Sequence, residues 1–153
     1  MNTWSDLAAA APEIAEAGRR LIYRREIGEA LLATVRDDEP PRINPIYVAI
    51  ADGRLLAFLH RSPKQAALAS DGRYALHTYV LPEEPDEFLV RGRARVIDSQ
   101  AEWATAAARW YFEVDADATL FEFSIETALL GERPGGAWPP RYSSWRAEGF
   151  AVR

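Results

Sequence analysis

The sequence predicts one small β-barrel of six antiparallel strands covered by helices. Short apolar stretches separated by turn-forming residues run through 28–130, a pattern typical of antiparallel barrels. Helical periodicity is confined to segments at 3–25, 63–70 and 99–112. The chain has 153 residues, 48% of them hydrophobic, which is enough for one domain with its own core.

Residues 1–27 are predicted to form a helical segment. Apolar residues recur at helical spacing from Trp4 onward, and Thr3 with Asp6 resembles a capping box. Pro12 should divide the segment into two helices, because proline fits a first turn but breaks a helix interior. We expect the apolar face of these helices to cover a sheet.

The first four strands of the barrel core, 28–130, are predicted at 30–35, 42–51, 54–60 and 74–81. Pro45 has no N–H to offer a neighbour, so its part of the second strand should be an edge or a bulge. Asp52 and Gly53 predict a hairpin turn into the third strand. That strand is apolar on both faces, which indicates burial on both.

The fifth and sixth strands, predicted at 87–97 and 119–128, carry rows of opposite charge. Arg91, Arg93 and Arg95 share one face of the fifth strand, and Glu122 and Glu126 share one face of the sixth. These rows predict that the two strands are neighbours. We interpret both rows as water-exposed sheet faces rather than as catalytic groups.

Residues 131–153 are predicted to be an irregular tail, because they are rich in proline and glycine. This tail contains Trp138 and Trp145, and disordered segments rarely carry two tryptophans. We therefore expect it to dock on the body of the protein or on a partner subunit.

Charge and composition exclude several classes of function. The formal net charge of -5 argues against a general binder of nucleic acid or of membrane surfaces. The absence of cysteine excludes disulfides, cysteine-based zinc sites and cysteine nucleophiles, and two histidines are too few for a histidine-rich metal site. No signal-like start and no apolar run of membrane-spanning length is seen, so we expect a cytoplasmic protein without a metal.

The turn at residues 60–64 is a candidate anion site. Ser62 is a good N-cap, and Pro63 fits the first helical position. Lys64 then lies at the positive end of the helix dipole, where a cation is unfavourable and a bound anion would be favourable. The alternative is a capped surface helix with a solvated lysine, and these residues alone leave both interpretations open.

No motif for a nucleophile, a nucleoside triphosphate or a dinucleotide occurs in the sequence. A chain without cysteine and with two histidines has few groups for demanding chemistry. If the protein is an enzyme, we expect a cofactor to carry the reaction.

Six short segments between residues 28 and 130 resemble a known family in their order and spacing. They are Ala30–Arg36, Pro41–Tyr47, Asp52–Leu55, Ser62–Lys64, Gly72–His77 and Glu87–Val96. Together they resemble the pyridoxamine 5'-phosphate oxidase-like family of FMN-binding split barrels. The resemblance implies a split β-barrel that forms a homodimer, with FMN bound at the interface.

The resemblance also implies the residues of the cofactor site. The flavin phosphate would be held by Arg42, Ser62 and Lys64. The other residues that it implies near the flavin are His60 and Arg61 in the turn, Asn44 and Tyr47 on the strand along the ring, and Glu87 close to a ring-contacting position. With Arg61, Lys64 and a helix N-terminus converging, the turn suits a phosphate dianion.

The resemblance implies an FMN-dependent oxidoreductase, a flavoprotein with a small-molecule substrate. The Arg-x-His and Arg-Leu-Ala-Pro signatures with which true pyridoxamine phosphate oxidases grip their substrate are absent, so oxidation of vitamin B6 is not expected. Arg141 and Trp145 are candidates for closing over a substrate, although docking of the tail is the simpler account. The alternatives are an F420-dependent reductase and a non-catalytic module that binds flavin or haem.

Overall fold

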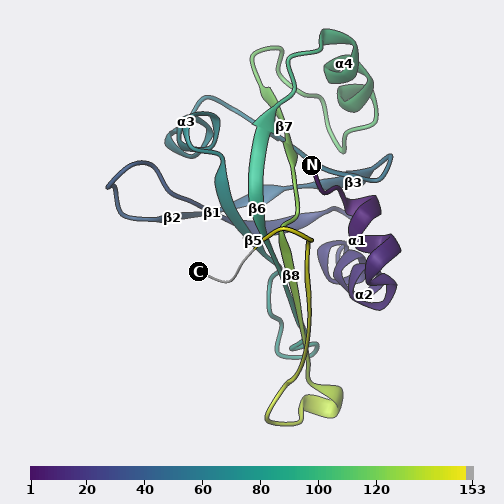
Figure 1. The fold of residues 1–153 in the computed structure, drawn as a ribbon. Coiled ribbons are helices and arrows are strands. Elements are labelled where there is room, and N and C mark those ends of the chain that lie inside the picture. The colour runs from purple at the N-terminus through teal and green to yellow at the C-terminus, as the bar shows by residue number, and fades with distance from the viewer. Residues whose placement is uncertain (151–153) are drawn as a thin grey trace.

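Nine strands form an antiparallel sheet that curls around a core, with four α-helices outside it, in the computed structural model, which describes residues 1–150 (Figure 1). The helices are α1 (Trp4–Ala10), α2 (Pro12–Ile22), α3 (Pro63–Ser70) and α4 (Gln100–Ala108). The strands are β1 (Glu29–Thr34), β2 (Arg42–Tyr47), β3 (Ala49–Ala51), β4 (Arg54–Leu59), β5 (Arg73–His77), β6 (Glu87–Val96), β7 (Thr119–Phe123), β8 (Thr127–Glu132) and β9 (Arg141–Arg146).

The predicted barrel of antiparallel strands with covering helices is confirmed, but its strand count differs. The stretch 42–51 bends at Val48 and becomes β2 and β3, and the stretch 119–128 breaks into β7 and β8. The C-terminal β9 adds a further strand. The predicted set of six strands therefore becomes nine within residues 1–150.

The long strand β6 belongs to both halves of the split barrel. Its first half pairs with β8, where Arg91 is opposite Thr127, and its second half pairs with β7, where Val96 is opposite Phe121. Gly92 lies between the two halves. A Cβ added there would be 2.0 Å from the backbone oxygen of Ser124, so the close approach at this crossing requires glycine.

The bend between β2 and β3 carries the chain from one half of the barrel to the other. The Val48 N–H donates to the Gly28 oxygen at 2.9 Å, and the Tyr111 hydroxyl donates to the Val48 oxygen at 2.7 Å. Before this bend, β2 pairs with β1 alone among the strands of residues 1–150 and is an edge strand. Pro45 lies within β2, as the missing N–H predicts.

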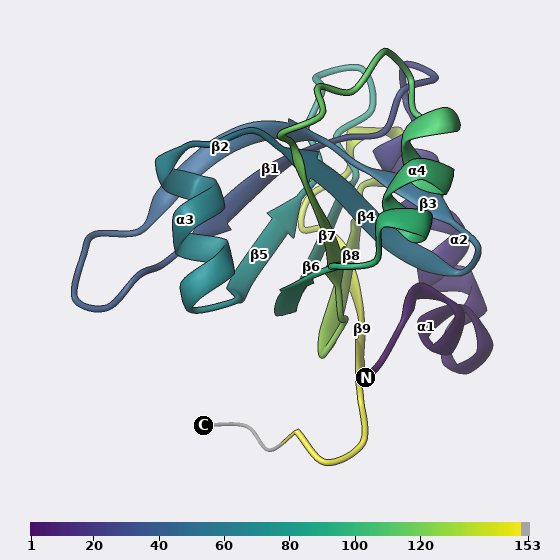
Figure 2. The ribbon, with the colours of Figure 1, turned by 90° about the horizontal axis from the view of Figure 1, so that it is seen from above.

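The helices α1 and α2 cover one side of the sheet, and α3 lies on the other (Figure 2). The predicted capping box is present at Thr3, and Pro12 begins α2. Trp4 and Leu7 of α1 and Ile14, Leu21 and Ile22 of α2 are buried in the main core, so these helices form the expected cover. Within residues 1–150, none of the helices has the length and apolar character needed to span a membrane.

The charged rows on β6 and β7 are neighbours, as predicted, but the expectation that both are water-exposed is wrong. Arg95 is opposite Glu122 in the register of β6 and β7. The Glu122 side chain is only 4% exposed, because Arg95 and Arg54 both cover it. The row on β7 therefore includes a buried, paired carboxylate.

The expected irregular tail contains a regular strand. β9 pairs with β8 along its full length, from Thr127 opposite Arg146 to Glu132 opposite Arg141. Trp145 packs against the main core, whereas Trp138 is 78% exposed beside a short 3₁₀ turn at Pro134–Gly136. Residues 151–153 of the predicted tail lie outside the described residues.

Candidate functional site

A pocket of about 310 Å³ lies between the start of β2 and the start of α3. Its lining consists of Arg42, Ile43 and Asn44 from β2 and of Ser62, Pro63 and Lys64 from the turn and first residues of α3. Four of the residues expected at the cofactor are thus brought together from two distant segments: Arg42, Asn44, Ser62 and Lys64.

The turn before α3 is built by the capping interactions of Ser62. Its backbone is extended, and its hydroxyl accepts a hydrogen bond from the Gln65 N–H at 3.3 Å and donates to the His60 oxygen at 3.0 Å. Pro63 has no N–H, and the Ala66 N–H donates to the Ser62 oxygen at 3.0 Å. Among the hydrogen bonds of residues 1–150, this leaves the Lys64 backbone N–H as the unpaired donor of the first turn.

The pocket carries positive charge that is only partly neutralised. Arg42 forms an ion pair with Glu39 at 3.1 Å, and both side chains are about half exposed. Neither Lys64 nor Arg61 takes part in any of the ion pairs found within residues 1–150. The Arg42 guanidinium comes from β2, and the Lys64 ammonium and backbone N–H come from the start of α3. Groups of these kinds bind phosphate in proteins.

Sequence patterns did not single out Glu39 as a site residue. Within residues 1–150, it is the one acidic group that forms an ion pair with a residue lining the pocket. It follows Asp37 and Asp38 in a turn, and such a run is usually solvated. The spacing of three residues between Glu39 and Arg42 is the signal that identifies the pair.

The other expected residues near this turn do not line the pocket. His60 is exposed, with its Nδ1 3.6 Å from an Asp115 carboxylate oxygen, and Arg61 is also exposed. Tyr47 is at the far end of β2, where its ring packs edge-on against Phe112 at 5.3 Å between centroids.

Glu87 begins β6 and Arg141 begins β9, where the β5–β6 and β8–β9 connections lie together (Figure 1). Trp145 lies further along β9, opposite Ala128, and lines a separate pocket. Glu87 lines a second pocket of about 180 Å³ with Trp138 and Tyr142, and its carboxylate is 3.2 Å from the His77 Nε2. Arg141 pairs with Glu132 at 3.0 Å. Within one chain, these residues are not part of the β2–α3 pocket.

Comparison with known proteins identifies the fold. No protein-family model and no curated protein matches the sequence. A heme binding protein from Mycobacterium smegmatis superposes with a TM-score of 0.61 at 15% identity, over 85% of this chain and 57% of that protein. A pyridoxinephosphate oxidase family protein from Clostridium acetobutylicum, related to general stress protein 26 of B. subtilis, gives 0.61 at 13% identity, over 92% and 94%. An FAD-binding protein from Mesorhizobium loti gives 0.58 at 19% identity, over 74% and 91%.

The chain therefore has the split-barrel fold of pyridoxine phosphate oxidase-like proteins, as the resemblance of its short segments implies. It spans little more than half of the Mycobacterium smegmatis protein, at 57%, and nearly all of the Clostridium acetobutylicum protein, at 94%. Of the three solved structures compared above, one is a heme binding protein and one is an FAD-binding protein.

Proposed function

We propose that this chain binds FMN and acts as an FMN-dependent oxidoreductase on a small-molecule substrate. One observation carries the proposal. Arg42 and Lys64 line one pocket between β2 and α3, and the Lys64 backbone N–H has no hydrogen-bond partner within residues 1–150. The FAD-binding protein of the same fold supports a flavin as the ligand.

The donor groups of the pocket fit a phosphate monoester. The Arg42 guanidinium offers planar paired donors, and Lys64 offers a compact positive charge. Glu39 competes for Arg42, but an ion pair between half-exposed side chains contributes only about 0–1 kcal/mol, so a phosphate dianion can displace it. Ser62 is already engaged on both sides of its hydroxyl, so its role is to fix the turn.

The pocket suits the phosphate and not the whole cofactor. At about 310 Å³ it is too small for a complete FMN, so the ring would extend along β2 past Asn44. This edge strand exposes Ile43, at 68% of its surface, and Tyr47. A second copy of the chain would cover the ring and these apolar side chains, which supports a homodimer with the cofactor at its interface.

FMN, when bound, would supply hydride or electron transfer. The residues of this chain would hold and orient it. Arg42 and Lys64 would fix the phosphate, and the β2 backbone would set the plane of the ring. Apolar side chains around β2 would keep water from the ring once they are covered.

Heme is the second candidate ligand, because the Mycobacterium smegmatis protein of this fold is a heme binding protein. Its iron would need an axial ligand. Both ring nitrogens of His77 are already engaged, with the Thr78 oxygen at 2.6 Å and Glu87 at 3.2 Å. The other histidine, His60, is exposed and does not line the β2–α3 pocket. The cations of the β2–α3 pocket favour a phosphate-bearing cofactor instead, either FMN or the deazaflavin F420.

The phosphate assignment is tested by comparing FMN with riboflavin, which lacks the phosphate. Flavin fluorescence titrations would use the wild type, Lys64→Ala and Arg42→Ala, with Arg36→Ala as the control because Arg36 does not line the pocket. Losing a charge-assisted hydrogen bond should weaken FMN binding by about 10- to 100-fold. Riboflavin binding should be nearly unchanged. Equal affinity of the wild type for FMN and riboflavin would contradict the assignment, and a parallel F420 titration decides between the two phosphate-bearing cofactors.

A further inference from the structure

A second cleft lies between α4 and the β3–β4 hairpin, and α4 is on the side of the strands away from α3 (Figure 2). Its volume is about 280 Å³. The apolar lining comes from Leu56 and Leu120 of the sheet, from Trp110 and from alanines on both walls: Ala49, Ala51, Ala101 and Ala106. It shares no lining residue with the β2–α3 pocket.

The cleft exists because the side chains between helix and sheet are too short to fill it. α4 has no buried residue, and its sequence after the N-cap is mostly alanine. The helix is instead attached through Trp103, whose indole N–H donates to the Ala118 oxygen at 2.8 Å and whose ring packs edge-on against Phe58. Alanine on both walls leaves an apolar slot between helix and sheet, which suits an apolar ring.

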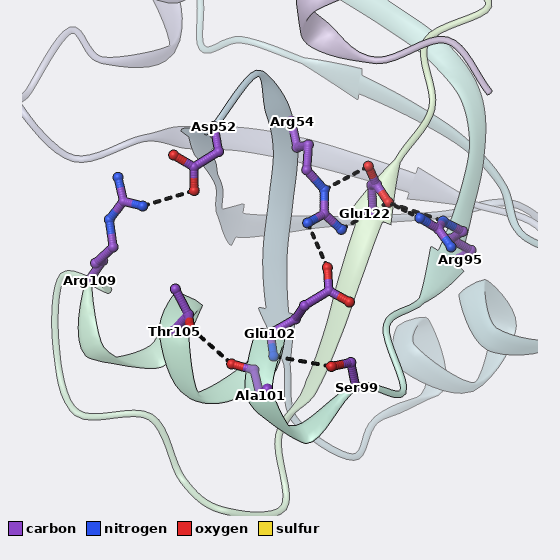
Figure 3. Close-up of polar contacts among 9 residues, drawn as sticks. All are labelled: Asp52, Arg54, Arg95, Ser99, Ala101, Glu102, Thr105, Arg109 and Glu122. Atoms are coloured by element: carbon purple, nitrogen blue, oxygen red, sulfur yellow. Dashed lines mark hydrogen bonds and ion pairs between the residues drawn. The ribbon is translucent and has the colours of Figure 1, made fainter.

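Two ion pairs join the hairpin to α4 at the two ends of this slot (Figure 3). At one end, Arg54 contacts Glu102 at 2.8 Å and also bonds the buried Glu122, so its charge is fully compensated. At the other end, Arg109 contacts Asp52 at 2.9 Å, and both of these side chains are mostly exposed.

Arg109 is the cation that remains available to a ligand. Only its Nη1 bonds Asp52, and its Nε and Nη2 have no hydrogen-bond partner among residues 1–150. The Nε–Nη2 edge of a guanidinium matches a carboxylate with two parallel hydrogen bonds. A cationic ligand would have no comparable fork, since Asp52 and Glu102 sit at opposite ends of the slot and each already accepts from an arginine.

We propose that this cleft binds small aromatic carboxylates. The ring lies in the slot between Leu56, Leu120 and the alanines of α4, and the carboxylate bonds the free edge of Arg109. Binding of this kind removes apolar surface from water and leaves no charge unpaired. The site is separate from the β2–α3 pocket.

The test is calorimetric titration of the full chain with 2-naphthoate, with 2-naphthylmethylamine as the cationic counterpart of the same ring. The wild type should bind the acid and not the amine. Arg109→Gln should weaken binding of the acid by about tenfold or more. Lys64→Ala, in the other pocket, should leave it unchanged.

A second variant tests the slot itself. Ala101→Leu places a larger side chain in the lining and should abolish binding of 2-naphthoate, whereas Ala104→Leu, on the exposed side of the same helix, should not. Thermal unfolding of each variant reports that the fold is kept. The proposal is overturned if the amine binds as tightly as the acid, or if either Arg109→Gln or Ala101→Leu binds 2-naphthoate like the wild type.

Discussion

Arg54 of β4 reaches the buried carboxylate of Glu122 on β7 with two hydrogen bonds, from its Nε at 2.9 Å and from its Nη2 at 3.1 Å (Figure 3). From the other side, Arg95 of β6 donates to the same carboxylate at 2.5 and 3.0 Å. One carboxylate thus ties together three adjacent strands of the barrel, and its ionisation should affect the stability of the whole fold.

We predict that stability falls in acid partly through Glu122. Burial raises the pKa of Glu122, but the hydrogen bonds and charges of Arg54 and Arg95 outweigh it and hold the pKa below its ordinary value of 4.5. A pKa that is lower in the folded than in the unfolded state stabilises the fold above the unfolded value. This contribution should therefore be complete above about pH 4.5 and be lost as the pH falls through the lower, folded pKa.

The measurement is urea unfolding of the wild type and Glu122→Gln across this pH range. At neutral pH the variant should lose about 2–3 kcal/mol, which is below the full cost of breaking a buried pair because both arginines are partly exposed. The difference between the two proteins should narrow below pH 4.5. The control is Glu126→Gln, because Glu126 is a partly exposed residue near Glu122. A difference in unfolding free energy between the wild type and Glu122→Gln that stays constant with pH would contradict the proposed role of Glu122.

The bend at Val48 gives a second prediction. The Tyr111 hydroxyl donates to the Val48 oxygen at 2.7 Å and accepts from the Gly28 N–H at 3.2 Å, and burial raises the pKa of this tyrosine. Tyr111→Phe leaves both backbone groups without this partner, which should cost about 1–3 kcal/mol. Thermal unfolding should show a clear loss for this variant and almost none for Tyr142→Phe, an exposed tyrosine. Equal unfolding temperatures for the wild type and Tyr111→Phe would contradict this role of the hydroxyl, because water would then replace it.

The local pattern of the sequence was enough for most of the strands and helices but not for their interruptions. Val48 is as apolar as its neighbours, so 42–51 was interpreted as one strand, although Tyr111 from a distant loop holds the bend. Glu122 alternates with apolar residues as an exposed residue would, and its burial depends on Arg54 from another hairpin. The sequence does not predict β9, because the prolines and glycines that precede it indicate an irregular segment. Its pairing with β8 is a tertiary contact that no local pattern shows.

The candidate site could likewise be predicted from the sequence only in part. The Ser62 cap and the Pro63 start of α3 follow from local rules, and both are present. That Arg42 and Lys64 line one pocket depends on how β2 and α3 pack, and only the resemblance to a known family pointed to it. Glu87 and Trp145 line two other pockets, which no local pattern could reveal.

The proposed dimer predicts that one substitution on β2 should change the oligomeric state of the protein. Ile43 on the edge strand β2 is largely exposed, and a charge there should prevent another subunit from covering it. Ile43→Glu should convert a dimer into a monomer in sedimentation velocity and should weaken FMN binding at the same time. Ala104→Glu on the exposed side of α4 is the control. A wild type that is monomeric at micromolar concentration, or a dimeric Ile43→Glu, would contradict an interface at β2.

The most direct test of the account is the visible absorption spectrum of the purified protein, combined with mass spectrometry of whatever molecule co-purifies. We predict a yellow protein with flavin absorbance, whose released ligand has the mass of FMN, and much less of it in the Ser62→Ala/Lys64→Ala double variant. A heme spectrum, a colourless protein that does not take up added FMN, or an unchanged FMN content in the double variant would contradict the proposed site.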